Sequence, residues 1–233
     1  MWELAVKLMG VSPRILPAPT QVARAGWQQR EVIAGHAAAT LQVTAVGFAL
    51  SMVCAWVLAI ASDFSPTLRK GLQPLLVASQ TVPVIAIAPL IIIWFGFGIV
   101  PKMLVVALVT FFPVAIGLIE AFDRTDRDAT RLLRSMGASR WQQFRMVRLP
   151  QAMPAFFTAL RIGITYAVTG AIFAEYVGAK QGLGIYMSVQ KNAFRTDLVL
   201  AAVVVTAALS IALYLSTSCL LYTSDAADDS LRP

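Results

Sequence analysis

Residues 124–154 read RTDRDATRLLRSMGASRWQQFRMVRLPQAMP and form the one long polar, basic stretch between apolar runs. Only two aspartates balance the arginines in and just beyond it, which stand at positions 124, 127, 131, 134, 140, 145, 148 and 161. Such a charge imbalance is foreign to a bilayer core, and the apolar residues between the arginines are not typical of a disordered linker. We interpret the stretch as a structured loop on the cytoplasmic side of a membrane.

Two short helices are predicted within this loop, because apolar residues recur at helical spacing in two groups: Leu132, Leu133 and Met136, then Trp141, Phe144 and Val147. Between the groups, Gly137 can adopt left-handed backbone angles, and Ser139 can accept backbone N–H bonds as the N-cap of the second helix. Pro150 and Pro154 are expected to end that second helix. The pattern predicts a helix–turn–helix near the membrane surface.

Composition places the chain in a membrane. Hydrophobic residues make up 58% of its 233 residues and charged residues only 13%, and the mean hydropathy is +0.72. The net charge of +7 does not point to nucleic acid, because the arginines cluster beside apolar runs, where the positive-inside rule accounts for them. We predict an all-α, polytopic helix bundle in a bacterial plasma (inner) membrane.

The apolar runs predict five complete spans, at residues 36–61, 74–96, 101–122, 156–177 and 197–218. A short basic loop with Arg69 and Lys70 follows the first span, and an external turn near Phe97–Val100 joins the second to the third. Prolines inside these spans free backbone carbonyls, which suits a water-lined translocation path and also occurs in purely structural spans. In the fourth span, Gly163 and Gly170 are expected at close helix contacts.

The two ends are expected to lie outside the transmembrane domain of residues 36–218. Residues 1–35 suit an external segment and a short surface helix that follow a missing first span. Residues 219–229, CLLYTSDAADD, can be back-translated into a transposon-type sequencing adapter. Residues 219–233 are therefore expected to be an artefact, and a genuine polar tail is the alternative.

The central loop resembles a known family. Gly137, followed at the right distance by VRLP at residues 147–150, is similar to the E-A-A-x-x-x-G…I-x-L-P loop of the permease subunits of binding-protein-dependent ABC importers. The resemblance implies six spans in the intact family and a coupling helix that sits in a cleft of a separate ATPase. The E-A-A triplet is Arg131-Leu132-Leu133 here, so a glutamate contact with the ATPase is not implied. The coupling residues implied are Arg131, Leu132, Leu133, Met136, Gly137, Ala138, Ser139, Leu149 and Pro150. A basic amphipathic loop lying on anionic lipid is the alternative.

Further segments resemble one subgroup of these permeases. VASQTVP at residues 77–83 and WFGFG at residues 94–98 are similar to permeases that import sulfonates, taurine, nitrate and thiamine-precursor pyrimidines. The pyrimidine is the favoured solute, and sulfonate, taurine or nitrate is the alternative. The implied path residues are Gln80, Thr81, Pro83, Trp94 and Phe95, although aromatic residues near a span end also serve as interface anchors.

Glu175 is a separate candidate for a gate or pore contact. It lies near the far end of a span, where a carboxylate is costly unless it is paired or wet. An interfacial glutamate exposed to water is the alternative.

Several functions are disfavoured by missing motifs. The chain has no Walker A pattern, so we expect no ATPase site and no cofactor of its own, with ATP and Mg²⁺ bound by the partner. One histidine and two cysteines do not suggest a metal site, and no motif of a membrane enzyme appears. An ion-coupled carrier remains the rival, although Glu175 alone is little support for it. The partners implied by the family are an ABC ATPase dimer, a second permease copy, an external solute-binding protein and the lipid bilayer.

Overall fold

The computed structural model describes residues 2–3, 6, 12, 14–79 and 81–229, and this part is built from helices without strands. The predicted all-α fold is thereby confirmed. The elements are α2 (Pro19–Gln28), α3 (Arg30–Phe64), α4 (Pro66–Ser79), α5 (Val84–Phe95), α6 (Ile99–Asp123), α7 (Arg127–Ser135), α8 (Arg140–Gln143), the π-helical segment η1 (Phe144–Arg148), α9 (Leu149–Gly178), α10 (Leu183–Asn192) and α11 (Thr196–Asp229).

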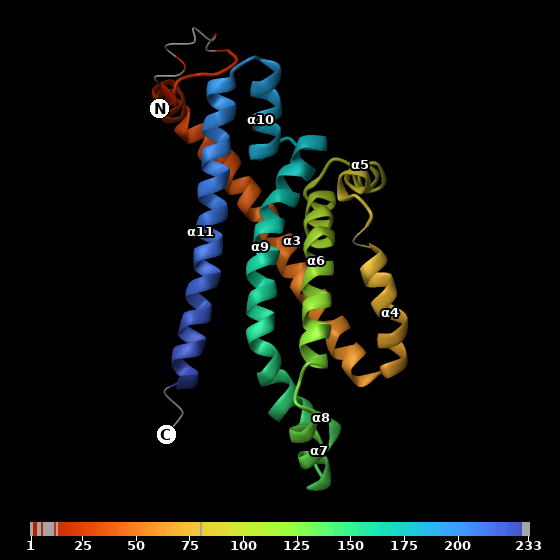
Figure 1. Cartoon of the computed structure of the whole chain (residues 1–233). Helices are drawn as coiled ribbons and strands as arrows, with labels where there is room; N and C mark the ends of the chain where they lie inside the picture. Colours follow the sequence, from red (N-terminus) through yellow and green to blue (C-terminus); the bar gives the residue numbers. More distant parts are fainter. Residues whose placement is uncertain (1, 4–5, 7–11, 13, 80, 230–233) are drawn as a thin grey trace.

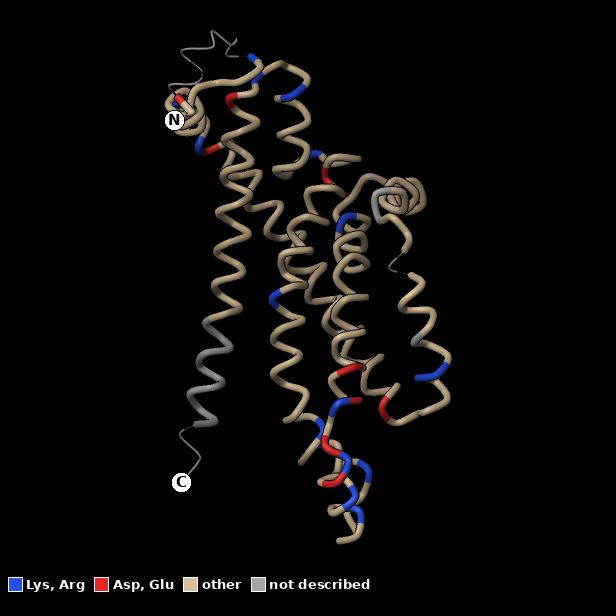
Figure 2. Tube along the Cα trace, viewed as in Figure 1, with Lys and Arg blue, Asp and Glu red and all other residues tan. Residues whose placement is uncertain are grey.

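The long helices α3, α6 and α9 pack together as the centre of the bundle (Figure 1). Helix α11 contacts α9 and α10 near the end of the bundle that carries α10 and separates from α9 toward its other end (Figure 1). The helical stretches long and apolar enough to cross a membrane are Arg30–Phe64, Ile99–Asp123, Arg140–Gly178 and Thr196–Ser218. Figure 2 shows charged residues gathered at the two ends of these helices, with few between them. The chain is a multi-pass membrane protein.

The predicted span 74–96 is wrong as a single helix. The structure has two shorter helices there, α4 and α5, with Pro83 as the N-cap residue of α5. Proline has no N–H to continue the ladder and disfavours helical angles in the residue before it, so the break falls at this point. Helix α5 then lies across the direction of α6, since Figure 1 shows it nearly along its axis. The expected loop around Arg69 and Lys70 is instead the first part of α4.

Glycines allow α9 to approach its neighbours closely, as expected. A Cβ atom on Gly163 would lie 3.0 Å from the Phe48 ring, and one on Gly170 would lie 3.3 Å from Val109. A Cβ on Gly47 of α3 would lie only 2.7 Å from Val106 of α6. The three central helices therefore pack closely at these glycines, which fixes the positions of the helices relative to one another.

The expectation that Pro150 and Pro154 end the loop's second helix is wrong. Residues 140–178 run as one continuous stretch, in which η1 joins α8 to α9. Pro150 sits in the first turn of α9 and Pro154 lies inside it. A π-helical turn offsets the hydrogen-bond register, and the first turn of a helix tolerates the missing proline N–H. The loop is consequently a direct extension of a membrane span.

Candidate functional site

The first half of the loop, α7, is defined at both ends by local hydrogen bonds. The Asp126 carboxylate accepts the N–H groups of Asp128 at 2.8 Å and Ala129 at 3.3 Å. After α7, Gly137 has a φ of +82°, and the N–H of Ala138 donates to the Leu133 carbonyl at 3.0 Å. This is a Schellman motif, which requires a left-handed residue at the glycine position.

The second half begins at Ser139, as predicted. Its hydroxyl accepts the Gln142 N–H at 3.3 Å, and the Gln142 side chain accepts the Ser139 N–H at 2.7 Å. These reciprocal bonds form a capping box. The predicted helix–turn–helix is therefore confirmed, with the turn at residues 136–139.

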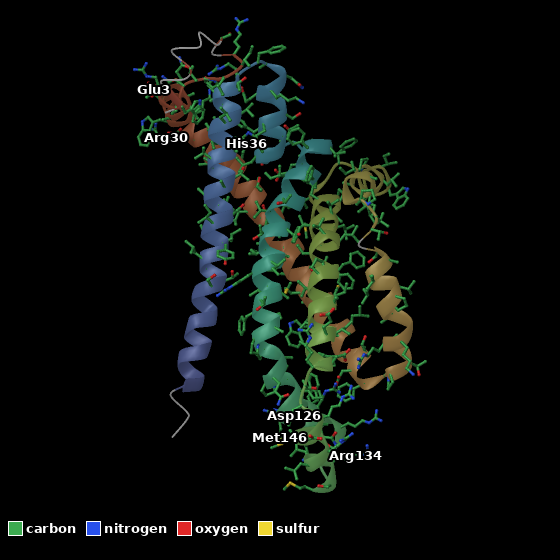
Figure 3. All side chains as sticks on the ribbon, in the orientation of Figure 1. Glu3, Arg30, His36, Asp126, Arg134 and Met146 are labelled. Carbon is green, nitrogen blue, oxygen red and sulfur yellow. The ribbon has the colours of Figure 1, made fainter. Side chains whose placement is uncertain are left out.

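The loop exposes large apolar side chains that nothing in the described chain covers. Leu132 is 62% exposed and Met136 74% exposed, while Leu133 and Leu149 are half-buried and Pro150 is exposed. Trp141 and Met146 are also exposed, and Figure 3 places Met146 and Arg134 at the tip of the molecule. An apolar surface rimmed by arginines is typical of a protein contact site.

Aromatic packing fixes the loop to the spans. Phe144 is 3% exposed, and its ring centroid lies 5.7 Å from that of Phe64 and 5.5 Å from that of Phe122. These contacts join η1 to the ends of α3 and α6. The loop is therefore packed against the ends of two membrane spans.

Two ion pairs reinforce the same junction. The Arg148 guanidinium lies 2.7 Å from the Asp63 carboxylate and donates to the Phe122 carbonyl at 2.9 Å. Arg69 of α4 pairs with Asp123 at the end of α6. By contrast, Arg131 in the loop pairs with Asp128 at 3.3 Å in a solvent-exposed position.

Replacing Asp63 with asparagine is expected to lower the free energy of unfolding by about 1–3 kcal/mol, because Arg148 would lose its carboxylate at a site where the Asp63 side chain is only 5% exposed. Thermal unfolding in detergent measures the effect. Asp128→Asn is the matched control, with an expected change below about 1 kcal/mol because its pair with Arg131 is exposed. Equal changes in the two variants would contradict the assigned anchoring role of Asp63.

At the opposite end of the bundle, side chains from α3 and α9 hold the start of α10. The Glu175 carboxylate accepts the Gly184 N–H at 2.9 Å and the Thr40 hydroxyl at 3.0 Å. The Thr40 hydroxyl in turn accepts the Leu183 N–H at 2.8 Å. The His36 Nδ1 atom accepts the Gly182 N–H at 3.1 Å. Three consecutive N–H groups, which a helix N-terminus leaves without partners, are thus satisfied from distant helices.

This outer cluster corrects one expectation about Glu175. The side chain has 0% exposure, so the alternative of an interfacial glutamate exposed to water is wrong. His36 and Thr40 were not singled out as its partners, and α10 itself was not predicted. The sequence does hold a signal at residues 178–184, GAKQGLG. Gly182 precedes α10 and has no side chain to cap it, so the N–H groups at the start of α10 need acceptors from other helices.

The other predicted path residues are not brought together with Glu175. Thr81 and Pro83 lie at the break between α4 and α5, whereas Trp94 and Phe95 are exposed at the other end of α5. The hydrogen bonds of Glu175 involve α3 and α10. Gln80, the remaining predicted residue, lies outside the described residues.

Comparison with known proteins gives a consistent result. Residues 42–226 match the family described as binding-protein-dependent transport system inner membrane component. The formylaminopyrimidine transport permease ThiX of Halalkalibacterium halodurans is 37% identical over 80% of this chain and 74% of its own length. The riboflavin transport permease RibX of Chloroflexus aurantiacus is 37% identical over 91% of this chain and 80% of its own length. The taurine transport permease TauC of Escherichia coli is 33% identical over 92% of this chain and 81% of its own length.

Solved structures show the same fold at low sequence identity. An amino acid ABC transporter with histidines aligns with a TM-score of 0.68 at 16% identity, over 85% of this chain and 95% of its own. The inward-facing MetNI methionine transporter aligns with a TM-score of 0.66 at 17% identity, over 86% of this chain and 97% of its own. The chain belongs to the family of inner-membrane permease components of binding-protein-dependent ABC transporters.

Proposed function

We propose that this chain forms the translocation path of an importer for a small organic solute and is driven by a separate ATPase through the loop around Gly137. The observation that carries the proposal is the exposed apolar surface of this loop, including Met136 at 74% exposure, on an element packed directly against α3 and α6. A permease subunit without its own ATPase site requires such a contact with an ATPase subunit. Residues 131–133, 136–139 and 149–150 are the proposed coupling positions.

The partners complete the proposed assembly. Two copies of the chain would line one passage between them, an ATPase dimer would bind and hydrolyse ATP with Mg²⁺, and an external binding protein would deliver the solute. Outward and inward access would alternate as the ATPase dimer closes and opens. The residues at the α4–α5 break and the end of α5 (Thr81, Pro83, Trp94 and Phe95), together with Gln80, are proposed path positions; the buried Glu175 is proposed to act on the outer gate through α10.

For the solute, we favour a pyrimidine precursor of thiamine, with sulfonate, taurine or nitrate as the alternative. The 37% identity to a formylaminopyrimidine permease supports the first, and the 33% identity to a taurine permease keeps the second open. Binding proteins carry much of the selectivity in such systems, so competition assays with both solute classes are needed to decide.

The test is uptake into cells that express the full chain together with its genomic ATPase and binding protein. We expect uptake to continue when a proton uncoupler is added and cellular ATP is held constant. We also expect the ATPase to co-purify with the chain from mild detergent. Loss of uptake on adding the uncoupler, with no ATPase recovered, would instead support an ion-coupled carrier.

A further inference from the structure

A second polar site lies beside the coupling loop, in a pocket of about 270 Å³. Its walls come from α4, the end of α6, α7 and η1. We call it the arginine pocket, because four of its seven lining residues are arginines and only one is a carboxylate; the residues are Arg69, Asp123, Thr125, Arg127, Thr130, Arg131 and Arg148. Of these residues, only Arg131 is also a proposed coupling position.

Three of the arginines form ion pairs with carboxylates. Arg69 pairs with Asp123, Arg148 with Asp63, and Arg131 with Asp128. A guanidinium has five N–H donors, and one carboxylate occupies at most two of them. Each of these arginines therefore retains donors for a further acceptor.

One lining arginine has no acceptor of its own in the described part of the chain. Arg127 lines the pocket without an ion pair or side-chain hydrogen bond among the described residues. Together with the donors that the paired arginines retain, the pocket thus offers several guanidinium N–H groups to an anionic ligand with several oxygen atoms.

We propose that the arginine pocket binds a phosphate group. Arginine forks match the oxygen geometry of phosphate, and a tetrahedral anion can accept from several arginines at once. The excess of arginine over carboxylate in the lining disfavours a cation. The pocket lies at the arginine-rich, cytoplasmic end of the spans, where the phosphate can come from an anionic lipid headgroup or from solution.

Binding has a structural consequence because the walls belong to two different parts of the molecule. Arg69 and Asp123 are on the membrane helices, whereas Arg127 and Arg131 are on α7. A bound phosphate would link the coupling loop to α4 and α6. Its occupancy would thereby stabilise one position of the loop, independently of whether an ATPase is docked.

The matched pair Arg127→Gln and Arg134→Gln tests the proposal. Both arginines are exposed on α7 and have no side-chain partner among the described residues, but only Arg127 lines the pocket. Each substitution removes the same charge from the same helix. A difference between them therefore reports the pocket rather than the general positive potential of the loop.

The experiment uses the full chain, purified and delipidated in detergent. In one arm, inorganic phosphate is titrated at constant ionic strength while thermal unfolding is followed. In the other, retention of phosphatidylglycerol is compared with that of phosphatidylcholine by native mass spectrometry. In at least one arm we expect the unaltered chain and Arg134→Gln to bind alike and Arg127→Gln to bind about tenfold more weakly.

The two arms distinguish the sources of phosphate. A response to inorganic phosphate supports a soluble ligand, and selective retention of phosphatidylglycerol supports a lipid headgroup. Absence of binding in both arms, or equal weakening by the two substitutions, would overturn the proposal. Neither result bears on transport, because no ATPase or solute takes part in the measurement.

Discussion

Replacing Gly182 with alanine is expected to destabilise the outer end of the protein by about 2–4 kcal/mol, the largest effect we expect from a single methyl group. Gly182 has a φ of +133°, and a Cβ atom there would overlap the Glu175 carboxylate. The substitution thus combines backbone strain with overpacking. It also displaces the carboxylate that accepts the Gly184 N–H and so releases the start of α10.

Thermal unfolding of the purified chain measures this effect, and Gly35→Ala in α3 is the control. A Cβ on Gly35 would meet nothing within 4 Å, and its φ is not positive. Alanine is expected to be neutral or stabilising there, because it favours a helix over glycine by about 1 kcal/mol. If Gly182→Ala unfolds at the same temperature as the unaltered chain, the outer cluster does not hold α10 in place.

Replacing Gly137 with valine is expected to reduce uptake at least about tenfold while the ATPase still hydrolyses ATP. Left-handed angles cost a residue with a Cβ about 1–2 kcal/mol, and a β-branched residue more. The turn with its φ of +82° would therefore rearrange, and the exposed residues of α7, which form the proposed ATPase contact, would be displaced. Uptake and hydrolysis are measured together in vesicles that contain the reconstituted transporter.

Two further variants separate backbone geometry from bulk. Gly137→Asn should retain most of the uptake, because asparagine tolerates left-handed angles. Gly71→Val in α4 adds the same side chain at a helical glycine with nothing within 4 Å of the added Cβ and should leave coupling intact. Normal uptake in Gly137→Val, or equal losses in the valine and asparagine variants, would contradict a role for the left-handed turn.

Local sequence was sufficient for several features that depend on neighbouring residues. The helix–turn–helix followed from Gly137 and Ser139, because a left-handed C-terminus and a capping box each involve residues within a few positions of one another. The all-α membrane fold followed from the apolar runs in the same way. The break at Pro83 had a local cause as well, but the continuous apolar run around it favoured the prediction of a single span.

Long-range contacts decided the rest. Glu175 is 135 residues from Thr40, and His36 is 146 residues from Gly182, so no pattern within either segment reveals that they meet. The arginine pocket likewise needs α4, α6, α7 and η1 in one place. The sequence by itself determined the all-α membrane fold and the helix–turn–helix around Gly137, since these depend on composition and short-range hydrogen bonds. Only the tertiary structure decided which buried charged groups contact which unpaired N–H groups, because these contacts depend on how the helices pack.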